Sequence, residues 1–457
     1  MSDAPQRALA RFVVETPAAW ITPAARARCR VALVDTLACS IAGVADPVVV
    51  QERRYLQALH PRSLPPSWIA PAAGDVEHAA FAAAVVAHAV DFDDVAPAWR
   101  GHPSAVLFPA LFALASTAGA ALDDVLAAYV VGFEVGAMLG GAVKGRHYER
   151  GWHSTATVGV IAGTAACARL LRLDVEQSVS ALGLAVAQAA GVQANFGTAA
   201  KPMQAGFAAA AAVRAALLAA QGVTASAQAL AGRGGFAELL ADGILGEVAP
   251  GAAPAVIAGI ETKLYPACYA AHRAIEAALQ LRADDTSIAE RVVSIRVLGS
   301  KNAHTPLLRR LPHDAAEAKF SAEYVVACAL VDGAVGLRAF AREPTADARI
   351  GALMAQTTVS ESADAAPARW GEVELRLRDG AIRRARVTAL HGDAGGCPRA
   401  EVIAAKLGDC LLSVGIAADA GAIVDQVAQA AGQPAATLFA RGVLAQVLAA
   451  ATRSWSG

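Results

Sequence analysis

The first half of the chain is a succession of helix-length segments rich in alanine, glycine and other small apolar residues. Alanine costs the least of all residues to hold in a helix, and small residues spaced four apart let two helix axes approach closely. The pattern therefore predicts a domain of tightly packed helices. The segments with apolar residues at helical spacing are Ala25–Ala42, Val76–Val90, Ser104–Ala118, Leu122–Val143, Thr155–Leu171, Val175–Ala190 and Ala205–Gln221.

The pattern of apolar and polar residues changes after Lys263. Arg291–Val297 alternates apolar and polar residues, as a half-buried strand does. Val373–Leu377 and Ile382–Val387 flank the dipeptide Asp379-Gly380, which is a strong hairpin signal because both turn positions favour positive φ. The second half of the chain is therefore expected to contain a sheet.

A chain of 457 residues is too long for one ordinary hydrophobic core, so two domains are expected. Helical patterns at Arg273–Leu281 and Ser321–Leu330 lie beside the predicted strands, and the segment from Arg399 onward is helical again. We therefore predict a mostly α fold with a large all-helical domain and a smaller α+β lid domain. The expected limits are residues 1–262 for the helical domain, 263–396 for the α+β domain, and 397–457 for C-terminal helices that return to the helical domain.

The charges of the chain nearly cancel, with 39 Lys and Arg residues against 40 Asp and Glu residues. Such a balance gives no long-range field that attracts nucleic acid or an anionic membrane, so neither is an expected partner. The chain is 56% hydrophobic, but its most apolar segments are interrupted; Pro109, Ser116 and Thr117 break Ala105–Leu122. Spanning a bilayer takes about 20 mainly apolar residues. We therefore expect buried helices and no membrane span.

The seven cysteines are scattered, and none forms a Cys-x-x-Cys pair. Neither a disulfide framework nor a zinc site is therefore indicated. The first residues, Met1–Arg11, lack an apolar stretch of signal-peptide length. We expect a cytoplasmic protein.

The densest group of polar residues in the apolar first half lies between His88 and Asp94. His88 and Asp91 are three residues apart and would share one face of a helix. Pro103 can occupy the first turn of the next helix, whose free N–H groups would face an anion held near His102. The alternative is that the acidic residues merely cap and end a helix, an interpretation that applies best to Asp94.

Three more polar groups lie at predicted junctions between elements. His153 precedes an Ala- and Gly-rich helix, Lys201 leads into another, and Lys263 is followed by Cys268 and His272. Each is a weak indication alone, because a single histidine before a helix is often a cap or a surface residue. Together, two histidines and two lysines at such junctions indicate a binding site, since binding groups concentrate there.

The ordered set of these motifs resembles the MmgE/PrpD family, from the first helices to about residue 400. The strings that carry the resemblance are His88-Ala-Val-Asp-Phe-Asp-Asp94 with His102-Pro-Ser104, Gly151-Trp-His153, Lys201 with Gly206, Lys263-x-Tyr-Pro-x-Cys268, Lys319-Phe-Ser321 with Tyr324, and Gly396-Cys-Pro398. The resemblance implies a large helical domain formed by both chain ends, a smaller α+β lid domain and a homodimer. It also implies acid–base chemistry on small di- and tricarboxylates, without a metal or an organic cofactor.

The resemblance implies roles for individual residues as well. We predict catalytic roles for Asp91, His102, His153 and Tyr324, and substrate-binding roles for Lys201, Lys263, Ser104 and His272. A tricarboxylate brings up to three negative charges, which the lysines and protonated histidines can meet. A histidine can also move a proton near neutral pH, and we expect the Asp91 carboxylate to orient or charge His102.

One departure from the family pattern bears on the substrate. Many members follow the Asp-Phe-Asp-Asp string with Thr and often His, whereas Val95 and Ala96 stand here. A hydroxyl that could hold or protonate the substrate is therefore absent. Cys268 also stands where some members carry His, and Trp99 and Arg100 lie in the same loop as Val95, where they could supply replacement contacts.

Several functions remain open at this point. The first expectation is a hydro-lyase of the 2-methylcitrate dehydratase type; the family also includes cis-aconitate decarboxylases and an iminodisuccinate epimerase. A metal-dependent enzyme is a second class, because the His88–Asp94 segment and His102 offer oxygen and nitrogen ligands. A non-catalytic carboxylate-binding protein is a third. The sequence has no glycine-rich phosphate loop and no clustered Cys/His site, so we expect neither a nucleotide nor a metal cofactor.

Overall fold

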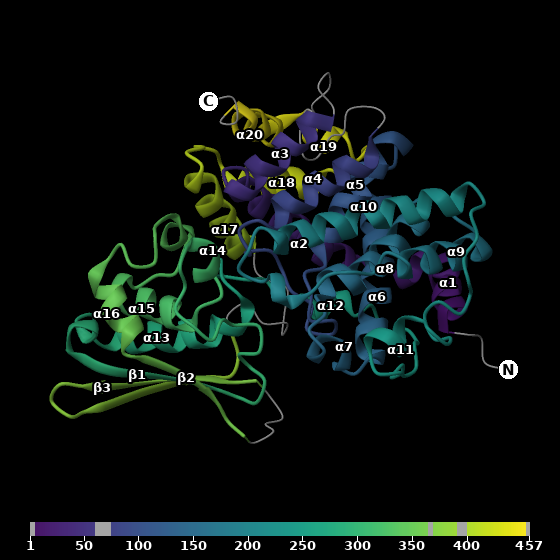
Figure 1. Ribbon diagram of the computed structural model, residues 1–457. Coiled ribbons are helices and arrows are strands. Elements are labelled where there is room, and N and C mark those ends of the chain that lie inside the picture. The colour runs from purple at the N-terminus through teal and green to yellow at the C-terminus, as the bar shows by residue number, and fades with distance from the viewer. Residues whose placement is uncertain (1–4, 60–74, 364–368, 391–399, 454–457) are drawn as a thin grey trace.

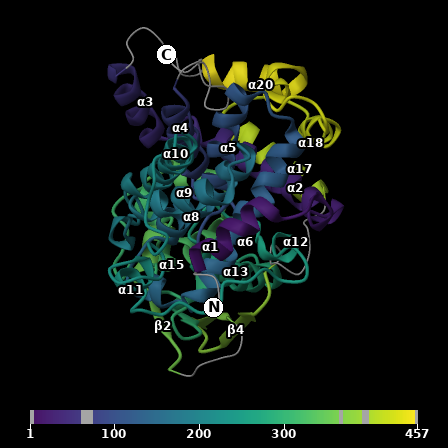
Figure 2. The same ribbon diagram turned by 90° about the vertical axis from the view of Figure 1, so that its right-hand side faces the viewer.

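The computed structural model describes residues 5–59, 75–363, 369–390 and 400–453. Its elements form two bodies of unequal size: a large one built of helices, and a smaller one in which helices lie over a sheet (Figure 1). The helices that follow residue 400 lie with the large body and not with the sheet (Figures 1 and 2). The predicted mostly α fold with a smaller α+β part is confirmed.

The large body contains helices from both ends of the chain. They are α1 (Pro5–Glu15), α2 (Pro23–Gly43), α3 (Pro47–Leu59), α4 (Val76–His88), α5 (Ser104–Ala118), α6 (Leu122–Ala142), α7 (Arg146–Glu149), α8 (Ser154–Leu170), α9 (Val175–Val186), α10 (Ala200–Ala220), α11 (Phe236–Leu240), α12 (Val256–Gly259), α17 (Ala400–Ser413), α18 (Ala420–Gln429), α19 (Thr437–Ala440) and α20 (Gly442–Arg453). Most limits agree with the predictions within a few residues. However, α10 begins before the predicted Ala205, so Lys201 lies in its first turn.

Small residues allow the central helices to pack closely, as their spacing predicted. A Cβ on Gly132 of α6 would lie 2.6 Å from the Cβ of Ala166 on α8, a distance that no real pair of side chains tolerates. By length and composition α6 and α10 could cross a membrane, and the bent pair of α2 and α3 could form a further span. The most apolar windows of α6 and α10 are 78% and 67% buried inside the protein. Neighbouring helices thus cover most of that apolar surface.

The smaller body is built on a four-stranded sheet with the order β2-β1-β3-β4. Its elements are α13 (His272–Asp284), β1 (Val292–Gly299), α14 (Ala315–Ala318), α15 (Ala322–Asp332), α16 (Ala348–Ala355), β2 (Thr357–Glu361), β3 (Gly371–Leu377) and β4 (Ile382–Val387). The predicted hairpin is confirmed: β3 and β4 pair antiparallel, and Gly380 in their turn has a φ of 83°. β2, which pairs parallel with β1, was not predicted. Its five residues are neither fully buried nor strongly apolar.

Two separate hydrophobic cores underlie the two bodies. The first combines buried residues from Leu9 to Ile260 with others from Ile403 to Ala451. The second lies between Ala267 and Leu390, where α13 and α15 pack on each other and α13 packs on β3 and β4. The expected boundary between residues 396 and 397, and the string Gly396-Cys-Pro398, lie outside the described residues.

Candidate active site

A cavity of about 740 Å³, part of it open to solvent, lies between the two bodies. The large body contributes residues from the segments 91–102, 148–155 and 196–201, the connecting segment contributes residues from 261–270, and the smaller body contributes residues 302, 303, 306, 320 and 369. The cavity is therefore formed jointly by the two bodies and the segment that connects them.

The loop between α4 and α5 carries the first polar residues of the cavity. α4 ends at His88, and the chain then turns through Asp91, whose φ of 53° lies in the left-handed region that Asp adopts more readily than most residues. Farther along, Val95 N donates to Glu261 O at 2.9 Å, and Glu261 N donates to Val95 O at 2.8 Å. These two bonds hold the loop against the segment that leads into the smaller body.

Asp91 is the centre of a buried ion-pair cluster at the floor of the cavity. Lys263 Nζ donates to Asp91 Oδ1 at 2.6 Å and to the Asp91 backbone oxygen at 2.8 Å, and Lys201 Nζ lies 3.1 Å from the same Oδ1. Burial alone would raise the pKa of Asp91, but the two ammonium groups hold it well below its usual range. Asp91 is therefore ionised and is shared by two lysines that both line the cavity.

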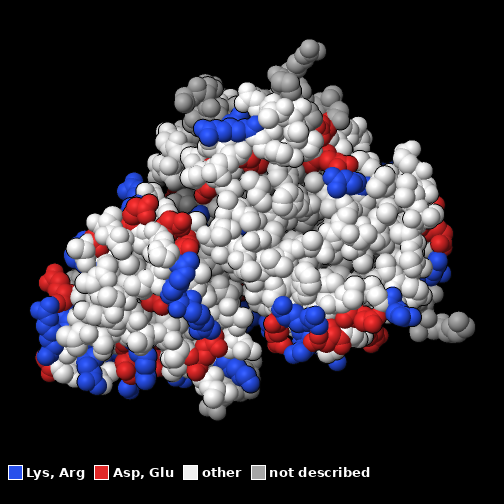
Figure 3. Space-filling model, in the orientation of Figure 1, with Lys and Arg blue, Asp and Glu red and all other residues white. Residues whose placement is uncertain are grey.

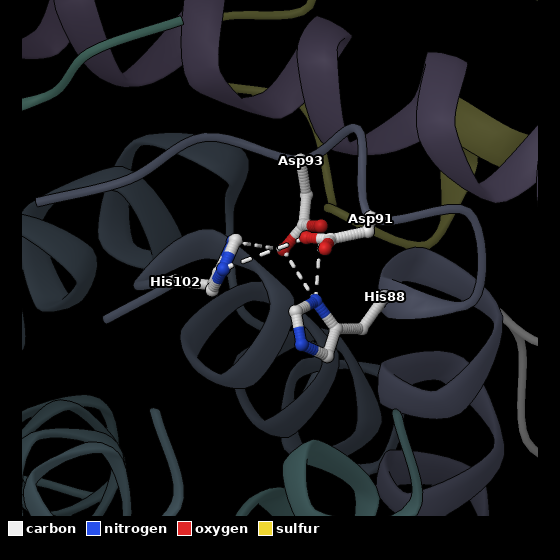
Figure 4. Close-up of side chains that lie close together, drawn as sticks. All are labelled: His88, Asp91, Asp93 and His102. Atoms are coloured by element: carbon white, nitrogen blue, oxygen red, sulfur yellow. Dashed lines mark hydrogen bonds and ion pairs between the residues drawn. The ribbon is translucent and has the colours of Figure 1, made fainter. Parts of the chain in front are cut away.

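Asp93 joins two imidazoles beside this cluster (Figure 4). His88 Nδ1 lies 2.9 Å from both carboxylate oxygens of Asp93, and His102 Nδ1 lies 3.1 Å from Asp93 Oδ2. His102 Nε2 lies 3.7 Å from Asp91 Oδ1. The predicted pairing of Asp91 with His102 is present as this longer contact, while Asp93 is the nearer carboxylate and the two lysines lie closer to Asp91.

The partners of His88 define its tautomer. His88 Nε2 lies 2.9 Å from Lys201 Nζ, and an ammonium group can only donate, so Nε2 accepts and the proton sits on Nδ1, facing Asp93. Burial lowers the pKa of His88, and it lowers the pKa of His102 to about 4 against the opposing charge of Asp93. Both imidazoles are therefore neutral near pH 7.

His153 stands directly before α8, and its ring nitrogens have different surroundings. His153 Nδ1 lies 3.1 Å from Gln204 Oε1, while Gln204 Nε2 donates to Val192 O at 3.2 Å, which fixes the amide orientation. His153 Nδ1 therefore carries the proton. A Cβ on Gly191 would lie 2.6 Å from Gln204 Oε1, so the glycine makes room for this bond. His153 Nε2 is buried without a partner among the described residues, and the residue lines the cavity, which makes Nε2 a candidate proton acceptor.

The structure places Ser104 away from the cavity. Its backbone N donates to Asp94 Oδ1 at 3.3 Å, its hydroxyl donates to Asp94 Oδ2 at 2.6 Å, and the hydroxyl also lies 2.7 Å from the Tyr129 hydroxyl. The start of α5 therefore faces the Asp94 carboxylate and not a bound anion near His102, contrary to expectation. Asp94 binds the first residue of α5, but it does not end a helix as the sequence's alternative had it, because α4 already ends at His88.

Two other predicted residues are also not brought to the cavity. Tyr324 is fully buried in α15, where its hydroxyl donates to Ala339 O. His272 Nε2 bonds to Ala267 O at 3.1 Å, and its ring packs against Tyr265. Both belong to the interior of the smaller body, while Asp91, His102, His153, Lys201 and Lys263 line the cavity.

Sequence reasoning overlooked several groups that the structure brings to the site. His88 and Asp93 were considered only as possible metal ligands, because helical spacing paired His88 with Asp91. Arg100, Tyr148 and Arg369 also line the cavity. Arg100 was noted only as a possible replacement contact, and no sequence pattern connects it with Arg369, which lies in another body of the molecule.

The cluster includes four residues whose ligand atoms lie within 4.8 Å of one another: His88, Asp91, Asp93 and His102. Such a set invites comparison with a divalent metal site. However, both nitrogens of His88 are engaged, and two ammonium groups lie 2.6 Å and 3.1 Å from Asp91 Oδ1. Their positive charges would repel a dication. The donor set therefore fits a charge-balanced hydrogen-bond cluster and does not fit a metal centre.

Comparison with known proteins agrees with this arrangement. Residues 7–245 match the MmgE/PrpD N-terminal domain, and residues 265–429 match the MmgE/PrpD C-terminal domain. Cis-aconitate decarboxylase of Homo sapiens is 27% identical over 341 residues, which cover 69% of this chain and 68% of the relative. The enzyme of the same name from Aspergillus terreus is 28% identical over 338 residues, 67% of each chain. With both domains matched, the chain belongs to the MmgE/PrpD family of lyases.

Proposed function

We propose that this protein is a lyase that removes carbon dioxide from an unsaturated tricarboxylate of the cis-aconitate type, using only its own side chains. The observation that carries the proposal is the cavity floor, where two ammonium groups and neutral imidazoles gather around Asp91 and Asp93. Relatives named cis-aconitate decarboxylase support the choice of reaction. They do not single out the 2-methylcitrate dehydratase that the sequence first suggested.

The reaction needs charge stabilisation and one proton. The C–C bond to one carboxylate breaks and releases CO₂, the electron pair moves toward the neighbouring unsaturated carboxylate, and one carbon takes up a proton. Lys201 and Lys263 place fixed positive charge where negative charge develops. Burial lowers the pKa of Lys201 although Asp91 opposes the shift, which makes this ammonium a better proton donor.

The cavity wall at Val95 and Ala96 favours decarboxylation over dehydration. Both residues line the cavity with apolar side chains. A dehydratase substrate carries a hydroxyl group that must be bound and protonated as it leaves, and a buried hydroxyl without a partner is costly. An unsaturated acid has no such hydroxyl, so an apolar wall suits it better.

The test is a turnover assay in D₂O followed by NMR, with cis-aconitate, 2-methylcitrate and a chiral dicarboxylate as separate substrates. We expect CO₂ release from cis-aconitate and one non-exchangeable deuterium in the product. Loss of water from 2-methylcitrate with cis-aconitate left intact would replace the proposal by a dehydratase. Deuterium exchange at a stereocentre without net loss of mass would indicate an epimerase.

A further inference from the structure

The cavity floor carries no excess positive charge. The ammonium groups of Lys201 and Lys263 both pair with Asp91, and Asp93 adds a second negative charge beside His88 and His102, so the four charges cancel. His102 adds no charge near pH 7, because burial lowers its pKa to about 4. A ligand with three carboxylates therefore needs further cationic groups elsewhere on the cavity wall.

Arg100 occupies the cavity wall in a turn that is fixed on several sides. One backbone hydrogen bond closes the turn across residues 96–101. Trp99 packs so tightly on α6 that a Cβ on Gly140 would lie 2.5 Å from the Trp99 Cβ. Arg100 itself has a φ of 51°, a left-handed conformation that persists only where surrounding structure enforces it. Its guanidinium carbon lies 5.3 Å from the centre of the Tyr148 ring, so the head group is positioned before a ligand arrives.

Arg369 lines the same cavity from the smaller body. It directly precedes Trp370, whose backbone oxygen accepts a bond from Ser300 N at 3.1 Å and whose ring lies 4.2 Å from the Arg386 guanidinium carbon. Arg369 is exposed to solvent, but neighbouring residues still remove part of the water around its guanidinium group; this desolvation and, next, the positive charge of Arg100 lower the pKa of Arg369. The two guanidinium groups thus repel each other across the cavity wall.

Within the part of the chain that the structure describes, no carboxylate forms an ion pair with Arg100 or Arg369. Glu261 also lines the cavity, and its negative charge partly opposes the lowering of the Arg369 pKa. The two guanidinium groups carry like charges, and their N–H groups are available to a ligand. An anionic ligand would relieve the repulsion between them, since Arg binds carboxylates through two parallel hydrogen bonds. The wall therefore has the excess of positive charge that the floor lacks.

We propose that Arg100 and Arg369 form a second carboxylate subsite, which holds the carboxylate that the floor lysines do not bind and selects tricarboxylates over dicarboxylates. This inference rests on the proposed function and adds the basis of its substrate selection. Because Arg100 belongs to the large body and Arg369 to the smaller one, the bound carboxylate joins the two bodies.

The test compares two unreactive ligands that differ by one carboxylate: tricarballylate, with three, and glutarate, with two on the same carbon chain. Affinities are measured by calorimetry, or as inhibition constants, for the whole protein and for Arg100→Ala, Arg369→Ala and Arg383→Ala. Arg383, exposed on β4 outside the cavity, is the matched control. We expect both cavity variants to bind tricarballylate about 10- to 100-fold more weakly and to bind glutarate within about threefold of wild type. Arg383→Ala should bind both as wild type does.

Wild-type affinity for tricarballylate in Arg100→Ala and Arg369→Ala, or equal losses for both ligands, would overturn the subsite. Turnover of cis-aconitate by the wild-type protein shows which proposal has failed. If the wild type turns over cis-aconitate and the arginine variants bind tricarballylate normally, only the subsite proposal is refuted and the proposed function stands. A wild-type protein that neither binds tricarballylate nor turns over cis-aconitate refutes both proposals. Arg369 is exposed, so its variant keeps the test valid if Arg100→Ala unfolds.

Discussion

The loop between α4 and α5 has two faces, and each is held by a buried lysine. On the cavity face, Lys263 Nζ donates to the Asp91 backbone oxygen at 2.8 Å and pairs with the Asp91 carboxylate at 2.6 Å. On the core face, Lys406 of α17 donates to the Phe92 backbone oxygen at 2.7 Å and pairs with Asp35 of α2 at 2.6 Å. The two lysines thus bind consecutive carbonyl groups with nearly the same geometry.

The surroundings of the two pairs differ. Lys406 lies 3.9 Å from the centre of the Phe92 ring and does not line the cavity. Although burial opposes it, Asp35 raises the pKa of Lys406, so this cation is fixed. Asp91 instead adjoins open space and a second lysine. A buried ion pair alone therefore does not indicate a site; access to a cavity does. The face shown in Figure 3 adds no such indication, because Lys, Arg, Asp and Glu intermingle on it.

The largest expected effect is on turnover at the cavity face. Lys263→Ala should lower kcat/KM by on the order of 10³, because it removes a fixed cation beside the developing negative charge. Asp91 keeps Lys201 as a partner and adjoins the cavity, so the free energy of unfolding should change little. Steady-state kinetics and thermal unfolding, with the exposed Lys301→Ala as control, provide the measurement. Control-like turnover would show that Lys263 takes no part in the chemistry.

On the core face, substitution of Lys406 should lower the free energy of unfolding. Lys406→Met leaves Asp35 buried without its cation, and removing one partner of a buried pair costs about 3–5 kcal/mol. The double variant Asp35→Leu with Lys406→Met should recover most of that loss, because it leaves no uncompensated charge. Urea unfolding of the three proteins tests this. If Lys406→Met unfolds like wild type, the two faces do not differ in the way proposed.

Asp91 and Asp94 extend the comparison along the loop, because their pKa values shift in opposite directions. Burial raises the pKa of Asp94 to about 7, whereas the lysines lower that of Asp91. Between its unfolded pKa of 3.8 and about 7, native Asp94 holds a proton that the unfolded chain has lost, so its contribution to stability falls as pH rises. The free energy of unfolding of Asp94→Asn should therefore rise relative to that of wild type by about 1 kcal/mol for each pH unit between pH 5 and 7.

Urea unfolding at pH 5, 6 and 7 measures that difference, and Asp91→Asn is the control of opposite sign. The lowered pKa of Asp91 contributes stability above its unfolded pKa, so Asp91→Asn should be less stable than wild type at every one of these pH values. A stability difference between Asp94→Asn and wild type that stays constant with pH would contradict the raised pKa of Asp94.

Much of the fold could be predicted because helical periodicity is local. The limits of α5, for example, follow directly from the sequence. The site was predicted only in part, since its residues meet through turns that periodicity does not describe. Helical spacing paired His88 with Asp91, but α4 ends at His88, and the left-handed Asp91 places Asp93 against the imidazole instead.

Ser104 and Tyr324 were predicted to lie in the site, but the structure places both elsewhere. Both fall in motif strings, and both were assigned to the site for that reason. Ser104 instead binds the Asp94 carboxylate, and Tyr324 points into the core of the smaller body. A motif gives residue types and order, while the direction of a side chain depends on tertiary packing. Arg100 and Arg369 come together only through the docking of two bodies, which no local pattern describes.

The smallest expected effect concerns the protonation of the His102 imidazole, which should stay neutral over a wide range of pH. An unperturbed histidine has a pKa of about 6.5, so at pH 5 only about 3% of it would be neutral. Burial lowers the pKa of His102 to about 4, which keeps its neutral form dominant from pH 8 down to pH 5. Asp93 favours the protonated ring, so Asp93→Asn should lower this pKa further. NMR titration of the His102 imidazole, assigned with His102→Gln, checks both statements. A midpoint near 6.5 would mean that water reaches the floor of the cavity freely, and the contrast between the two faces of the loop would then lose its physical basis.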